Sequence, residues 1–168
     1  MTAAEAERVA AFEAVLREHD RLLRAFACRL VGRDVDDVLQ SAYLAAFRAM
    51  PQFRGESSLS SWLHRIVYTT AINHIRSHER RVRRDELGAL RESGDDFAVE
   101  TASRLDLEAA LSRIPVDQRA ALLLVDVQGF SYDDAARILG VAPGTVASRL
   151  SRARGVVRAA LMTEREGA

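Results

Sequence analysis

The chain has 168 residues, in which 24 arginines and no lysine balance 24 acidic side chains, and 48% of the residues are hydrophobic. That length fits one ordinary domain or two small ones, with enough apolar material for cores. No run of about 18 apolar residues is present and the N-terminus lacks a signal-peptide pattern, so we expect no membrane insertion and a cytoplasmic protein. The single cysteine, Cys28, excludes an intrachain disulfide and a cysteine-cluster zinc site.

The neutral total hides an uneven distribution of charge. Residues 76–84 hold five arginines and one acid, residues 85–108 hold eight acids and two arginines, and residues 135–163 hold five arginines and no acid. Two basic segments on either side of an acidic one favour two surfaces for a polyanion, joined by a segment that avoids it. Two solvated helix faces are the alternative, because charge alone does not decide between them.

The composition, rich in Ala, Leu and Arg and poor in Gly and Pro, predicts an all-helical protein. Apolar residues spaced by three, four and seven predict a helix over residues 8–31, with Cys28 in its apolar stripe and therefore in the core. Asp34 is the expected cap of a second helix, which ends near Pro51. After a polar loop over residues 51–61, whose serines can cap the next element, a third helix is expected from about residue 59 to residue 81.

The second half predicts a compact helical unit. Helices are expected over residues 105–114, 117–127, 131–139 and 143–161, with Pro115 and Gly140 as breaks. Residues 85–103 lack a sustained period and are expected to form an acidic linker. We therefore expect two small helical domains, over residues 7–84 and 104–163, joined by a flexible linker.

The sharpest motif lies in residues 131–154. Ser131 and Asp134 have the spacing of a capping box, Gly140 suits a tight turn, and Pro143 suits a first helical position, so the segment predicts a helix-turn-helix. The outward face of its last helix offers hydroxyl and guanidinium groups suited to base edges in the major groove, on Thr145, Ser148, Arg149 and Arg152. An ordinary amphipathic hairpin with a solvated basic face is the alternative.

Residues 107–154 resemble region four of bacterial sigma factors, above all the extracytoplasmic-function (ECF) group of the sigma-70 superfamily. The resemblance rests on LEAALSRIP, on Arg119 four residues after Pro115, and on the GTV and SRLSRAR segments of the last helix. It implies that this half binds the minus-thirty-five element of promoter DNA. Ala147, where the family often has lysine, is a departure.

The segment DVDDVLQSAYLAAF, residues 34–47, is similar to the family's core-polymerase-binding helix. The resemblance implies contact with the clamp helices of the largest subunit of RNA polymerase through Asp36, Asp37, Gln40 and Tyr43. Asp37, Gln40 and Tyr43 follow one another at spacings of three, which we expect to put them on one face. A solvated helix face is the alternative for this segment taken alone.

The segment PQFRGESSLSSWLHRI, residues 51–66, resembles the family's loop and helix that recognise and melt the minus-ten element. Opening a duplex needs a pocket for an unstacked base and positive charge for the freed strand. Trp62 is expected to be a core anchor rather than a stacking platform. The candidate minus-ten residues are Phe53, Arg54, Gly55, Arg65, Asn73, Arg76 and Arg80.

The prediction from the sequence is therefore a non-enzymatic ECF sigma factor without metal or cofactor, whose partners are core RNA polymerase and promoter DNA. A separate anti-sigma factor is a further candidate partner, because such partners are common in the family. A polymerase-independent helix-turn-helix regulator is the main alternative. A third hypothesis, a metal-dependent enzyme around His74 and His78, lacks an evident third ligand.

Overall fold

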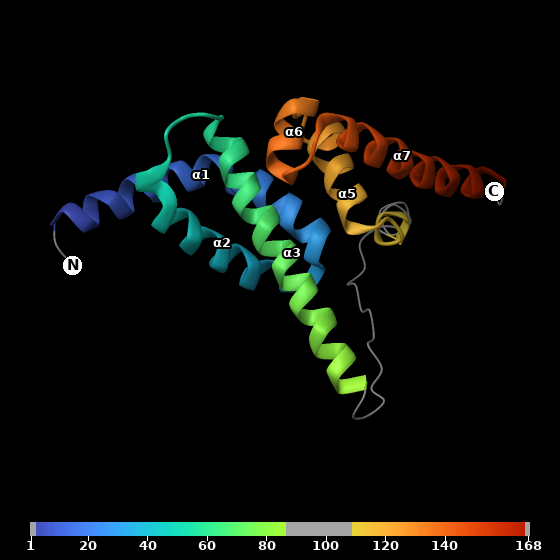
Figure 1. The fold of residues 1–168 in the computed structure, drawn as a ribbon, viewed down its shortest axis with the longest axis horizontal. Helices are drawn as coiled ribbons and strands as arrows, with labels where there is room; N and C mark the ends of the chain where they lie inside the picture. Colours follow the sequence, from blue (N-terminus) through green and yellow to red (C-terminus); the bar gives the residue numbers. More distant parts are fainter. Residues whose placement is uncertain (1–2, 87–108, 167–168) are drawn as a thin grey trace.

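The computed structural model describes residues 3–86 and 109–166, and every regular element in these two ranges is helical, which confirms the all-helical prediction (Figure 1). In the first half, short 3-10 turns at Gly32–Asp34 and Met50–Gln52 separate the helices α1 (Ala3–Val31), α2 (Val35–Ala49) and α3 (Leu59–Glu86). The second half begins with a helical turn over residues 109–112. It continues with α5 (Val116–Leu122), a π-helical turn (Leu123–Val127), α6 (Tyr132–Leu139) and α7 (Pro143–Glu166).

The expected linker, residues 85–103, lies outside the described residues except for its first two positions, which belong to α3. The third helix therefore runs five residues further than the 81 that the periodicity predicts, and α1 begins five residues earlier than residue 8. Both extensions are arginine- or alanine-containing stretches of good helix propensity, which an apolar period does not detect.

The start of α2 differs from the prediction. Asp34 occupies the N-cap position, but its side chain makes no capping hydrogen bond. The preceding 3-10 turn holds Asp34 at φ −82° and ψ 13°, outside the extended conformation in which a cap side chain reaches the helix N–H groups. Its carboxylate instead lies 2.8 Å from Nε2 of His74 on α3, so Asp34 joins α3 to the start of α2.

The helix-turn-helix forms as predicted. The backbone N–H of Asp134 donates to Oγ of Ser131 at 3.0 Å, and the Ser131 hydroxyl donates to the Asp134 carboxylate at 2.7 Å. Gly140 ends α6 with φ 67°, a left-handed conformation that glycine adopts without strain. The sequence between α6 and α7 is therefore a tight turn that fixes the direction of α7.

The two halves pack on each other and share their larger hydrophobic core. In Figure 1, α2 and the helices α5–α7 lie on opposite sides of α3, and α1 passes behind α3 toward α5. One hydrophobic cluster runs through both, from Leu63, Val67 and Ala71 on α3 to Ala135 and Ile138 on α6. A smaller cluster lies within the second half, built by Leu111, Ile114, Leu122, Leu150 and Ala153.

Polar and aromatic contacts also join the two halves, and the interface between residues 3–86 and 109–166 is here called the seam. The Gln128 amide donates to the Leu22 carbonyl at 2.8 Å, and the Arg119 guanidinium donates to the Arg29 carbonyl at 2.9 Å. The rings of His64 and Phe130 meet edge to face with centroids 4.9 Å apart. The seam therefore has directional contacts as well as apolar packing.

The prediction for Cys28 is wrong, because its side chain is exposed. Around Cys28, the buried face of α1 consists of Leu23, Phe26, Ala27 and Leu30. Cys28 is two residues beyond Phe26, a rotation of roughly 200° around the helix, and so it points away from that face.

Candidate functional site

The outer surface of α2 carries three of the four residues predicted to bind a polymerase. Asp36, Asp37 and Gln40 are exposed, whereas Tyr43 is half-buried. The Tyr43 hydroxyl donates to Asp20 on α1 at 2.7 Å, and burial together with this carboxylate raises the pKa of the phenol above its usual value. The expected common face of Asp37, Gln40 and Tyr43 is therefore not formed, since Tyr43 turns toward α1.

Asp36 also has an intramolecular partner. Its carboxylate accepts a hydrogen bond of 2.7 Å from Nη1 of Arg24 on α1, and this bond raises the pKa of the guanidinium. Together, Arg24–Asp36 and Tyr43–Asp20 join α1 to one edge of α2. Asp37 and Gln40 have no such contact with α1 and face solvent.

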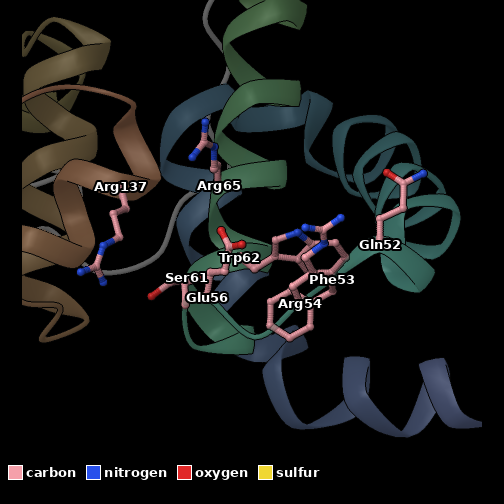
Figure 2. Close-up of a pocket in the computed structure, with 9 residues that line it drawn as sticks. Gln52, Phe53, Arg54, Glu56, Ser61, Trp62, Arg65 and Arg137 are labelled. Carbon is pink, nitrogen blue, oxygen red and sulfur yellow. The ribbon is translucent and has the colours of Figure 1, made fainter.

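The loop before α3 surrounds a hollow of about 460 Å³, shown in Figure 2. The Phe53 and Trp62 rings lie side by side in it, with centroids 5.1 Å apart. Gly55 allows the bend of the loop with φ 73°, and Ser58 caps α3 by accepting from the Ser61 N–H at 3.1 Å. Trp62 packs against the core, as predicted, and also lines the hollow.

Guanidinium groups from both halves border this hollow. Arg54 belongs to the loop and Arg65 to α3, whereas Arg137 lines the far side from α6 (Figure 2). The Arg137 guanidinium is already paired with Asp134 at 3.1 Å. The carboxylate of Glu56 is the acidic group on its wall. A cavity of this size with aromatic and cationic walls suits a flat, electron-rich ring attached to a phosphate.

Exposed polar residues continue from the hollow along α3. Arg65, Asn73, Arg76 and Arg80 are all exposed. Their spacing of eight, three and four residues keeps them within a sector of about 80° around the helix axis. The structure thus brings these four predicted minus-ten residues onto one surface, next to the Phe53–Trp62 pair.

The face of α7 that is predicted to contact the minus-thirty-five element is only partly exposed. Ser148 and Arg152 are exposed, Thr145 is half-buried, and Ser148 Oγ donates to the Thr145 carbonyl at 3.0 Å. The Arg149 side chain is 19% exposed and pairs with Asp117 on α5 at 3.0 Å. The Tyr68 hydroxyl of α3 lies 3.4 Å from the other oxygen of Asp117.

A cleft of about 450 Å³ separates α3 from the second half at this point. Arg76 from the minus-ten set lines it together with Arg149 and Arg152 from the minus-thirty-five set. Residues predicted to contact two different promoter elements therefore face one space. An acidic side chain from each half, Glu79 and Asp117, also lines it.

The hypothesis of a metal site around His74 and His78 finds no third ligand in the part of the chain that the structure describes. No group of three or more His, Cys, Asp or Glu side chains in residues 3–86 and 109–166 is arranged to hold a metal ion. His74 is instead paired with Asp34 at 2.8 Å.

These features define a class of protein: a helical transcription factor with a helix-turn-helix in one half and an aromatic, arginine-bordered hollow in the other. Residues 15–81 match the Sigma-70 region 2 family, and residues 104–155 match Sigma-70, region 4. The chain belongs to the ECF RNA polymerase sigma factors of the sigma-70 family, which confirms the resemblance found in the sequence.

Individual relatives agree with this assignment. The ECF RNA polymerase sigma factor SigM of Mycobacterium tuberculosis is 43% identical over 147 residues, which cover 86% of this chain and 74% of that protein. The ECF RNA polymerase sigma-E factor of Haemophilus influenzae is 32% identical, with 88% of this chain and 85% of that protein covered. The sigma factor RpoE of Bartonella quintana, solved in complex with the anti-sigma factor NepR, has a TM-score of 0.78 at 33% identity, covering 90% and 97% of the two chains.

Two contacts of the site could not be predicted from local sequence motifs. The Arg149–Asp117 and Tyr43–Asp20 pairs join residues far apart in the chain, so no local pattern indicates them. Leu44 is a third feature, and a sequence pattern could have indicated it. It is 49% exposed on α2, and it follows Gln40 by four residues and Asp37 by seven, which are the spacings of one helix face.

Within residues 3–86 and 109–166, none of the helices combines the length and the apolar character that a membrane-spanning segment needs.

Proposed function

We propose that this chain binds core RNA polymerase and directs promoter-specific initiation, by recognising the minus-thirty-five and minus-ten elements and helping to open the duplex. The observation that carries the proposal is the presence, in one chain, of both sigma regions. A polymerase-independent regulator explains the helix-turn-helix but leaves the region 2 half without a role.

Polymerase docking is assigned to the exposed part of α2. Asp37 and Gln40 offer a carboxylate and an amide that can accept hydrogen bonds from arginines of the clamp helices. Asp36 and Tyr43 are assigned a supporting role, because their contacts with Arg24 and Asp20 hold α2 against α1. The docking surface is therefore held rigid before the polymerase binds.

Minus-ten recognition is assigned to the hollow beside Phe53 and Trp62. An unstacked base needs an aromatic or apolar wall in place of its neighbours, and its phosphates need cations. The aromatic pair supplies the wall, and Arg54 and Arg65 supply the charge at its border. Beyond the hollow, the exposed side chains of Asn73, Arg76 and Arg80 on α3 can contact the sugar-phosphate backbone of the same DNA strand.

Minus-thirty-five recognition is assigned to Thr145, Ser148, Arg149 and Arg152 at the start of α7. Arg149 is held by Asp117 in this conformation, and it shares its cleft with Arg76 of α3. Promoter elements roughly two helical turns apart require their two readers to be separated by some 70 Å of DNA axis. We therefore propose that residues 7–84 and 104–163 act as separate domains on the promoter and that their seam opens there.

In this role the chain performs no catalysis of its own and requires no cofactor, since the polymerase carries out the chemistry. It acts in the cytoplasm, where the polymerase and the promoters are. An anti-sigma factor is a further candidate partner, because the RpoE relative of Bartonella quintana is solved in complex with one.

Binding to purified core polymerase tests the docking assignment directly. The doubly substituted chain, Asp37→Ala with Gln40→Ala, should bind core enzyme at least about tenfold more weakly, a change of ~1.4 kcal/mol. Its affinity for a minus-thirty-five duplex should be unchanged, because α2 lies on the opposite side of α3 from α7 (Figure 1). Unchanged polymerase binding by this variant would remove α2 as the docking surface.

A further inference from the structure

The most exposed large apolar side chain of the first half, within the residues described, belongs to Leu44 on α2. It is 49% exposed, and the other exposed large hydrophobic residues in this half are Leu22 at 45% and Val82 at 37%. Single exposed leucines are ordinary in soluble proteins, so exposure alone does not indicate a binding surface. The position of Leu44 among the neighbouring residues of α2 is what distinguishes it.

Seven residues of α2 are exposed, and Asp36 and Ala45 lie at the two sides of this surface. The five between them form a stripe about 100° wide, here called the docking stripe: Asp37, Gln40, Ser41, Leu44 and Arg48. At about 100° per residue, Leu44 lies about 20° from Asp37 and about 40° from Gln40, at the centre of this sector. The opposite side of α2 is buried through Val38, Leu39, Ala42 and Ala46. The stripe thus has an acid at its N-terminal end, an amide and an apolar side chain in the middle, and an arginine at its C-terminal end.

Tyr43 cannot supply the apolar part of this stripe. It lies about 120° around the helix from Asp37. Its hydroxyl is engaged by Asp20, and the side chain is half-buried against α1. Exposing Tyr43 to a partner would break this hydrogen bond and uncover the seam between α1 and α2.

We infer that Leu44 is the apolar centre of the polymerase-docking surface of α2. This inference rests on the proposed function, because it commits to the clamp helices of core RNA polymerase as the occupant. Continuity with Asp37 and Gln40 argues for that occupant, since a partner bonded to both must cover Leu44 as well. An apolar side chain flanked by polar ones of both charge signs is the usual composition of such an interface, with an apolar middle and a polar rim.

Equilibrium binding of the full-length chain to core polymerase tests the inference, with Leu44→Ala and Leu44→Glu as variants. We expect Leu44→Ala to weaken binding about tenfold and Leu44→Glu about a hundredfold, because the glutamate places a second negative charge beside Asp37 and must be desolvated. Leu44→Met, which keeps an apolar side chain of similar volume, should stay within about threefold of the unsubstituted chain.

The matched control is Leu22→Glu, which makes the same change at an exposed leucine on α1. It should leave the affinity within about twofold. Circular dichroism and the thermal midpoint of each variant separate a docking defect from a folding defect, since Leu44 contributes little to the core.

Two results would overturn the inference. Leu44→Glu binding as tightly as the unsubstituted chain would show that the polymerase does not cover Leu44. A Leu44→Glu variant that converts a dimeric chain to a monomer, with polymerase affinity unchanged, would assign the stripe to a second copy. Failure of the unsubstituted chain to bind polymerase is a distinct outcome, because it contradicts the proposed function itself.

Discussion

Arg149 of α7 donates to the carboxylate of Asp117 on α5 at 3.0 Å, in the cleft where the second half faces α3. The opposite terminal nitrogen of Arg149 is buried without a hydrogen-bond partner among the described residues. An arginine with one group engaged and another unsatisfied gains hydrogen bonds if an acceptor enters the cleft or if the cleft opens. Because Arg149 is also a proposed DNA-binding residue, its pairing with Asp117 links the packing of the two halves to DNA binding.

Asp117→Asn should tighten binding of the full chain to a minus-thirty-five duplex by roughly threefold, ~0.7 kcal/mol, because it frees Arg149 and removes a negative charge beside the phosphates. The measurement is fluorescence anisotropy at a fixed salt concentration, since phosphate contacts are salt-dependent. Asp133→Asn removes the same charge from an exposed position on α6 and should have a smaller effect. Weaker binding by Asp117→Asn would instead show that Asp117 positions Arg149 for its DNA contact.

Tyr43→Phe should destabilise the chain by about 1–2 kcal/mol, because it removes a half-buried hydrogen bond to a carboxylate and leaves Asp20 without it. Polymerase affinity should stay nearly unchanged, since the hydroxyl points to α1. Denaturant unfolding and polymerase binding measured on the same preparation give both quantities. A large loss of polymerase affinity with unchanged stability would show instead that Tyr43 belongs to the docking surface.

Acid should weaken the seam through His64. Its side chain is fully buried between the halves, and burial lowers the pKa of the imidazole, although its bond to the Ser60 carbonyl opposes the shift. The folded chain therefore binds a proton less readily than the unfolded chain, so stability is complete above the unfolded pKa of about 6.5 and falls as the pH drops below it, by up to ~1.4 kcal/mol per pH unit.

The control for this prediction is the exposed His78. The free energy of unfolding, measured with denaturant between about pH 7.5 and pH 5.5, should depend much less on pH in His64→Phe than in the unsubstituted chain. In His78→Gln the pH dependence should be retained. A slope that disappears with His78 instead would show that the buried imidazole is not the group that responds. The charged and polar groups near His64 are His19 on α1, Ser60 on α3 and Gln128 of the second half.

Phe130→Ala should favour separation of the two halves. The substitution removes the ring that contacts His64 across the seam, at a cost of roughly 2 kcal/mol for a half-buried phenylalanine. The radius of gyration from small-angle X-ray scattering should increase. Tyr132→Ala, at an aromatic residue that is 41% exposed, should leave the radius unchanged, and an unchanged radius in both variants would contradict the seam as described.

Local sequence patterns predict much of this structure. The helix-turn-helix follows from Ser131, Gly140 and Pro143, whose effects act within a few residues, and the capping bonds and left-handed turn confirm it. The end of α3 is not predicted, because arginine-rich helical turns have no apolar period. Cys28 is placed wrongly, because the period of a long helix does not by itself fix the edge of its buried face.

The contacts between the halves are outside the reach of such patterns. Gln128 and Leu22 are 106 residues apart, and Arg119 and Arg29 are 90 apart. Helix periodicity identifies which faces are apolar but not which face of another helix covers them. The family resemblance supplied the function of each half, and only the fold shows that Tyr43 and Arg149 already have partners within the chain.

The most direct test of the whole account is run-off transcription with purified core RNA polymerase, genomic fragments and the full-length chain, followed by mapping of the start sites. We predict that the chain joins core polymerase and that RNA starts at defined positions downstream of a shared pair of sequence elements, only when the chain is present. If the chain neither joined the polymerase nor changed where RNA synthesis begins, the assignment of its two halves to promoter recognition would be contradicted.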